Sequence, residues 1–276
     1  MKFFMSDFLR NTTYYMLRAL DKVIVGVPLL RRIVLYGFFD TQNSNADRDG
    51  HDSGIDSLFK DSLSERNNLP GVTAVYRVKN AEEFLRGSLI SIIPLAQEIV
   101  IVDNGSTDNT KEVIDRFTRE YGSLVSVRYY EYDKRIGRAG AGYRKELEEY
   151  PDRSIASFYN FCFSKATKDY VVKVDAHLIY SLNRIRQIQK SLSSGYDIIY
   201  YRGLEYLGKI LSVEPYVFKR NISWEYFDSE SYELLKFNGK YRRKFIVNPA
   251  FIHIKRIIYI SGILNDKNGI DALYEK

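Results

Sequence analysis

The sequence predicts an α/β protein with a mainly parallel sheet flanked by helices, and three observations lead to this fold class. Short runs of β-branched and aromatic residues alternate with segments in which apolar residues recur at helical spacing. The chain has 276 residues, of which 45% are hydrophobic and 28% charged, as in ordinary folded domains. Polar residues follow several of the apolar runs. We therefore expect helices on both faces of the sheet and a ligand site at the carboxyl ends of its strands.

The alternation of strands and helices starts near residue 69. Strands are predicted at residues 72–77, 98–103, 124–130, 170–174 and 196–201. Helices are predicted to begin after Asn80 and Asn109, and to occupy residues 157–166 and 185–192. Each Asn has a Glu three residues later, the spacing of a capping box, so we expect both to cap the helix that follows. The basic, glycine-rich residues 133–151 are expected to form a solvated loop.

The first 68 residues differ from the rest and are expected to form a helical N-terminal extension with a polar linker. Residues 1–40 have the pattern of one or two helices, whereas residues 41–68 are rich in Asp, Ser, Asn and Gly. Arg31 and Arg32 interrupt the apolar run of residues 23–39, which makes a membrane span costly. Two alternatives remain open: this segment contacts a membrane surface, or it packs on the main domain.

Charge and cysteine content limit the partners and the compartment. A net charge of +6 favours anionic partners such as nucleotide phosphates or acidic lipid headgroups. The basic residues show no aromatic-interleaved recognition motif, so we expect no nucleic-acid partner. Cys162 is the single cysteine, which excludes an internal disulfide and fits the reducing cytoplasm.

A pair of potential metal ligands ends the strand predicted at residues 170–174. Asp175 and His177 are two residues apart, so that both side chains can reach one point from an extended or turned segment. A carboxylate with an imidazole suits a divalent ion of intermediate character, such as Mn²⁺. The alternative is a strand that simply ends in a polar turn.

Three blocks of sequence resemble glycosyltransferase family 2. The first is Val-Tyr-Arg-Val-Lys-Asn-Ala-Glu-Glu at residues 75–83, and the second is Ile-Val-Asp-Asn-Gly-Ser-Thr-Asp-Asn-Thr at residues 101–110. The third, at residues 159–177, resembles the family's approach to its Asp-x-Asp metal motif, with His177 where the second Asp is more common. The resemblance implies a GT-A fold over residues 69–276, with a nucleotide-sugar half (69–180) and an acceptor half (181–276).

The resemblance also implies site residues for a UDP- or GDP-sugar and a divalent cation, Mn²⁺ or Mg²⁺. The metal and diphosphate would be held by Asp175 and His177. A late histidine turns back onto the metal in some GT-A enzymes, and His253 is the candidate; a buried core histidine is the alternative. Nucleotide contacts are expected from residues at strand ends and before the metal motif: Ala74, Tyr76, Arg77, Asp103 and Lys165. For Lys165 the alternative is a solvated lysine.

Family 2 enzymes invert the anomeric centre, which implies a carboxylate as general base on the acceptor hydroxyl. Asp228 and Glu230 are the first candidates, with Glu205 and Glu225 as alternatives. For each of them taken singly, a surface carboxylate is the competing interpretation.

The sequence thus indicates a metal-dependent inverting glycosyltransferase in cell-surface polysaccharide synthesis, acting on a glycan or lipid-linked acceptor. We expect it in the cytoplasm at the inner face of the membrane, with peripheral contact through residues 1–40. One alternative is a nucleotidyltransferase of similar architecture, although residues 75–83 lack the glycines of its usual signature. The other is a non-catalytic module that binds nucleotide-sugars.

Overall fold

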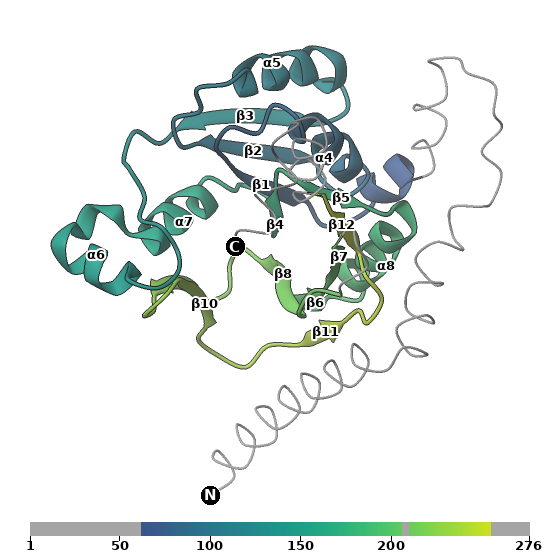
Figure 1. Cartoon of the computed structure of the whole chain (residues 1–276). Coiled ribbons are helices and arrows are strands. Elements are labelled where there is room, and N and C mark those ends of the chain that lie inside the picture. Colours follow the sequence, from purple (N-terminus) through teal and green to yellow (C-terminus); the bar gives the residue numbers. More distant parts are fainter. Residues whose placement is uncertain (1–61, 206–209, 255–276) are drawn as a thin grey trace, which may run out of the picture.

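The computed structural model describes residues 62–205 and 210–254. The helices expected in residues 1–40 and most of the expected linker lie outside the described residues. A seven-stranded sheet in the order β11-β6-β8-β4-β1-β2-β3 forms the centre of the molecule (Figure 1). Its strands are β1 (Val72–Val78), β2 (Glu98–Asp103), β3 (Ser126–Glu131), β4 (Tyr170–Asp175), β6 (Ile198–Tyr201), β8 (Glu214–Lys219) and β11 (Arg243–Phe245).

The prediction of a mainly parallel α/β sheet is confirmed. Strands β4, β1, β2 and β3 pair in parallel, and β11 pairs in parallel with β6. The exception is β8, which lies antiparallel between β4 and β6. The described residues between β6 and β8 (202–205 and 210–213) contain no helix, and a parallel return would need such a crossover connection.

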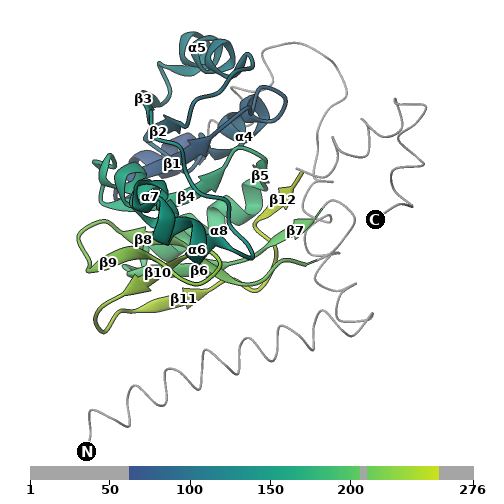
Figure 2. The ribbon, with the colours of Figure 1, turned by 60° about the vertical axis from the view of Figure 1, so that its left-hand side comes forward.

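Helices cover both faces of the sheet. Besides the helical residues 62–67, the described helices are α4 (Leu85–Ile92), α5 (Thr110–Tyr121), α6 (Tyr143–Glu149), η2 (Pro151–Arg153), α7 (Ile155–Ser164) and α8 (Leu182–Ser193). Alternate residues of each strand join different cores: Ala74 and Tyr76 pack with α4, α5 and α8, whereas Val75 packs with α7. The helices α4, α5, α7 and α8 can be followed in Figure 2. Arg77 has the parity of Val75 and therefore lies on the α7 face.

Two small sheets complete the described fold. Strands β5 (Leu178–Tyr180), β12 (Phe251–His253) and β7 (Gly203–Glu205) form one of them, with β12 in the middle. Strands β9 (Trp224–Asp228) and β10 (Glu233–Phe237) form an antiparallel hairpin that packs against α7. None of the helices in residues 62–205 and 210–254 combines the length and the apolar character that crossing a membrane requires.

Three local expectations are wrong. Neither Asn80 nor Asn109 caps its helix with its side chain, and α4 begins only after Phe84. The segment 133–151 is no simple loop, since it contains α6. Part of the expected linker is packed: residues 62–67 are helical, and Arg66 donates hydrogen bonds to the carbonyls of Ile93 and Ala96 at 3.0 and 2.9 Å.

Candidate active site

An ion pair between neighbouring parallel strands forms the centre of the candidate site. Arg77 of β1 and Asp175 of β4 are partners in the strand register, and Nη2 of Arg77 donates to Oδ1 of Asp175. The Arg77 side chain is 5% exposed and that of Asp175 is 40% exposed. Burial would raise the pKa of Asp175, but the neighbouring Arg77 and His177 outweigh burial and hold this pKa at about 2. The carboxylate is therefore ionised at neutral pH.

A cavity of about 370 Å³ opens over this ion pair. Its floor is made by the ends of β1 and β4, and its walls by α7, by the segment 136–139 and by the first residue of β10, Glu233. Helix α7 contributes Tyr159, whose ring centroid lies 4.1 Å from the Arg77 guanidinium carbon. The cavity thus combines cationic, anionic and aromatic groups at the carboxyl edge of the sheet, where ligands bind in this fold class.

Two buried side chains in the cavity wall keep polar atoms without a hydrogen bond within the described residues. They are Arg77, through Nε and Nη1, and Asn104, through Oδ1. The amide nitrogen of Asn104 is fixed, because it donates to the carbonyls of Tyr132 and Lys134 at 3.1 and 2.7 Å. Unsatisfied buried polar groups cost free energy, so they mark a place where a ligand can complete the hydrogen bonding.

Residues 104–110 are hydrogen-bonded to the loop that follows β1. These bonds explain why the side chains of Asn80 and Asn109 do not cap the helices that follow them. Asn80, with φ of 49°, turns its Oδ1 to accept from the backbone N–H of Thr107 at 2.8 Å. Glu82 accepts from the N–H of Asn109 at 2.9 Å, and Asp108 accepts from the N–H of Glu82 at 3.1 Å. These bonds join the loops after β1 and β2 and hold the cavity edge in place.

The structure brings together two histidines that are far apart in sequence. The rings of His177 and His253 lie 4.3 Å apart between centroids, at 78° to one another. Strand β12 places His253 beside β5 and also beside Glu205 of β7, whose Oε1 is 3.1 Å from Nδ1 of His253. A carboxylate on one ring nitrogen orients a histidine and leaves the other nitrogen for a metal.

Three residues expected to contact the nucleotide, Ala74, Tyr76 and Asp103, do not line the cavity. Ala74 and Tyr76 are fully buried on the opposite face, and the Tyr76 hydroxyl lies 3.2 Å from that of Ser88. Asp103 is buried, and its carboxylate accepts hydrogen bonds from Ser106 and Tyr129. Strand alternation decides the first two cases, since Arg77 alone of the three β1 residues faces α7.

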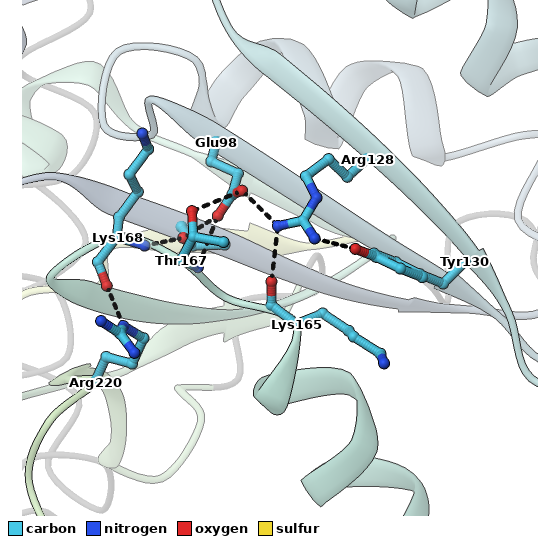
Figure 3. Close-up of polar contacts among 8 residues, drawn as sticks. Glu98, Arg128, Tyr130, Lys165, Thr167, Lys168 and Arg220 are labelled. Atoms are coloured by element: carbon cyan, nitrogen blue, oxygen red, sulfur yellow. Dashed lines mark hydrogen bonds and ion pairs between the residues drawn. The ribbon is translucent and has the colours of Figure 1, made fainter.

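Lys165 lies at the end of α7, beside Arg128 (Figure 3). Its carbonyl accepts from Arg128 at 3.1 Å, and Arg128 also pairs with Glu98, the first residue of β2, at 2.9 Å. The Lys165 ammonium lies 4.2 Å from the ring centroid of Phe161. The ammonium also lies 5.3 Å from the ring centroid of Tyr130, and its expected contact with a diphosphate stays a prediction.

The expected general bases, Asp228 and Glu230, do not line the cavity over Arg77 and Asp175. Both oxygens of Asp228 are occupied: Ser154 donates at 2.5 Å, the N–H of Ala156 donates at 2.9 Å, and the Tyr143 hydroxyl also donates. Asp228 thus fixes the start of α7. Glu230 is exposed in the turn between β9 and β10 and does not line the cavity.

Sequence reasoning missed three residues that line the cavity: Asn104, Tyr159 and Glu233. Asn104 follows Asp103 directly, so its position after β2 was a usable signal. Glu233 had none, because only the register of the β9–β10 hairpin brings it to the sheet edge.

Residues 49–256 match a protein family described as "Beta-1,4-N-acetylgalactosaminyltransferase (CgtA)". The chain belongs to this family. This match confirms the prediction that the chain is a glycosyltransferase. The match begins at residue 49, inside the segment expected to be a linker. The Asp-x-His interpretation of residues 175–177 stays a prediction.

One curated relative is the succinoglycan biosynthesis protein ExoA of Rhizobium meliloti (strain 1021), 25% identical over 143 residues. This alignment covers 51% of the present chain and 38% of ExoA, so the chain spans well under half the length of this relative.

Two solved structures are similar in outline. Staphylococcus aureus TarS (residues 1–349) is 14% identical with a TM-score of 0.47, over 71% of this chain and 66% of TarS. Glucosyl-3-phosphoglycerate synthase of Mycobacterium tuberculosis, crystallised with Mn²⁺, UDP and glucosyl-3-phosphoglycerate, is 13% identical with a TM-score of 0.43, over 80% and 82% of the two chains.

Proposed function

We propose that this chain transfers a sugar from a UDP- or GDP-sugar to a hydroxyl of a glycan or lipid-linked acceptor, with inversion and with Mn²⁺ or Mg²⁺. The observation that carries the proposal is the buried Arg77, paired with Asp175 at the base of a cavity in a chain of the CgtA family. Departure of a nucleoside diphosphate concentrates negative charge, which a fixed cation stabilises. The imide N–H of uracil or guanine is a suitable donor for Oδ1 of Asn104.

The donor set for a metal is Asp175, His177 and His253. One carboxylate with two imidazoles fits an ion such as Mn²⁺, and Glu205 beside His253 supplies the orienting carboxylate. Within the described residues, no three His, Cys, Asp or Glu side chains already surround one point. When bound, the ion would neutralise charge on the departing diphosphate. Arg77 then shares this task, because its guanidinium lies against the same carboxylate.

The test measures donor turnover and donor binding on the same protein. UDP-N-acetylgalactosamine is the first donor to try, because the family's description names this sugar; UDP-glucose and GDP-mannose complete the panel. With Mn²⁺ present, we expect release of nucleoside diphosphate, and thermal stabilisation by that diphosphate. Asp175→Ala should abolish both, whereas Asp115→Ala, at an exposed position on α5, should change neither. If no nucleoside diphosphate with metal stabilises the chain, the transferase proposal is wrong.

The location at the inner face of the membrane is part of the same proposal. It rests on the basic, aromatic character of residues 1–40. Vesicles with anionic headgroups should retain the full chain and lose a variant that lacks these residues. Equal retention of both proteins would contradict the membrane contact.

A further inference from the structure

We propose that Glu233 is the general base that takes the proton from the acceptor hydroxyl. This inference rests on the proposed function and goes further by assigning its proton transfer to one residue. The cavity over the Arg77–Asp175 pair is lined by two carboxylates, Asp175 and Glu233. Asp175 is already committed to Arg77, which leaves Glu233 for proton transfer.

The hairpin register directs Glu233 into the cavity. Along β10 the residues alternate, so that Leu235 and Phe237 pack against the core formed with α7, whereas Leu234 and Lys236 are exposed. Glu233 has the same parity as Leu235 and therefore faces α7. Its partner in the register is Asp228, which is fixed by hydrogen bonds at the start of α7. The strand that carries Glu233 is thus held firmly against the helix that forms the cavity wall.

A second contact holds the hairpin over the site. The backbone N–H of Gly140 donates to the carbonyl of Ser231 at 2.6 Å, which ties the glycine-rich segment to the hairpin turn. The same segment lines the cavity through Gly137, Arg138 and Ala139. Glu233 therefore lies between two walls that are joined to each other, a rigid placement of the kind that catalysis requires.

Tyr159 lines the cavity together with the two carboxylates, Asp175 and Glu233. Burial raises the pKa of the Tyr159 hydroxyl, and the negative charges of Asp175 and Glu233 raise it further, against the opposing effect of Arg77. Tyr159 hence stays protonated and can donate a hydrogen bond. Glu233 and Asp175 line the cavity from different elements, β10 and β4. A donor sugar held at Asp175 can therefore have Glu233 on the side from which the acceptor hydroxyl approaches.

The other carboxylates considered are occupied or remote. Asp228 accepts hydrogen bonds on both oxygens, and Glu205 lies against His253. Glu230 and Glu225 are exposed and do not line the cavity. In the step assigned here, the acceptor oxygen forms a bond to the anomeric carbon while its proton passes to Glu233. The bond from that carbon to the diphosphate oxygen breaks, and its electron pair leaves with the nucleoside diphosphate.

The test uses the full chain with Glu233→Gln, Glu233→Ala and the control Glu148→Gln, at a position on α6 where the side chain is 68% exposed. Glu233→Gln should lower kcat by about 10²- to 10⁴-fold, the usual range for a general base. Its dissociation constant for the nucleoside diphosphate with Mn²⁺ should change by less than about threefold, because the base does not touch the diphosphate. Glu148→Gln should match the unmodified chain in both measurements.

Azide distinguishes a general base from a residue with a merely structural role. This anion attacks the anomeric carbon without losing a proton, so its reaction does not need a general base. Glu233→Ala should form the glycosyl azide from the donor, and the same amount of azide should give little additional turnover with the unmodified chain. The proposal is overturned if Glu233→Gln keeps kcat within tenfold, if it loses donor binding together with turnover, or if azide yields no product. If the unmodified chain transfers no sugar from any donor, the proposed function fails first, and the assignment of Glu233 fails with it.

Discussion

Arg77→Met separates stability from binding at the candidate site. Methionine keeps most of the length and the apolar stem of the arginine and removes its charge. Arg77 is 5% exposed, pairs with a carboxylate that is 40% exposed, and stacks on Tyr159 at 4.1 Å. The change therefore removes one ion pair and one cation–π contact, and it also removes the two buried nitrogens that lack a hydrogen bond.

These effects on the free energy of unfolding nearly cancel. Loss of one partner from a buried pair costs about 3–5 kcal/mol, but an exposed pair contributes about 0–1 kcal/mol, and Asp175 lies between these cases. Each unsatisfied buried donor costs about 1–3 kcal/mol, which the substitution recovers. We expect a net change below about 2 kcal/mol. Binding behaves differently, because a hydrogen bond to a charged donor contributes about 1.5–3 kcal/mol, or about 10- to 150-fold in affinity.

Calorimetric titration of the nucleoside diphosphate with Mn²⁺, together with urea unfolding, measures both quantities. Arg86→Met is the matched control, since Arg86 is an arginine on α4 that is 47% exposed and pairs with Glu120. The control should bind as the unmodified chain does. The reasoning is refuted if Arg77→Met binds within twofold of the unmodified chain, or if it unfolds with a loss above about 4 kcal/mol.

Two further predictions concern the scaffold. Burial would raise the pKa of Glu98, but hydrogen bonds from Thr73, Arg128 and Thr167 outweigh it and lower this pKa below 4.5. The stability that comes from ionised Glu98 is fully present above about pH 4.5, and it is lost as the pH falls through the lowered pKa of the folded state. Glu98→Gln should therefore weaken the dependence of the free energy of unfolding on acid pH, as measured by urea unfolding. At pH 7 the substitution should cost about 1–3 kcal/mol of stability. A Cβ at Gly203 would lie 2.0 Å from the buried ring of Phe251. Gly203→Ala should therefore destabilise the fold by about 1–3 kcal/mol in thermal unfolding, and it should also weaken Mn²⁺ binding. An unchanged melting temperature would contradict this prediction.

The sequence alone determined the order of the elements and the edge of the sheet that carries the site. Apolar runs of strand length marked β1, β2 and β4, and the polar residues after them, Arg77 and Asp175, are partners in the strand register. This success has a simple physical basis, because periodicity and the carboxyl-edge rule depend on local sequence and on parallel pairing. The metal-ligand pair expected at Asp175 and His177 follows from the same rule and stays a prediction.

Only the tertiary structure decided which side chains reach the cavity. Strand alternation places Ala74 and Tyr76 on the face opposite Arg77. The approach of His253 to His177, and the presence of Glu233 in the same cavity as Arg77, depend on pairing between strands that are distant in sequence. Such pairing is set by packing of the whole core, so no local pattern could show that Glu233 lines the cavity or that Asp228 lies at the start of α7.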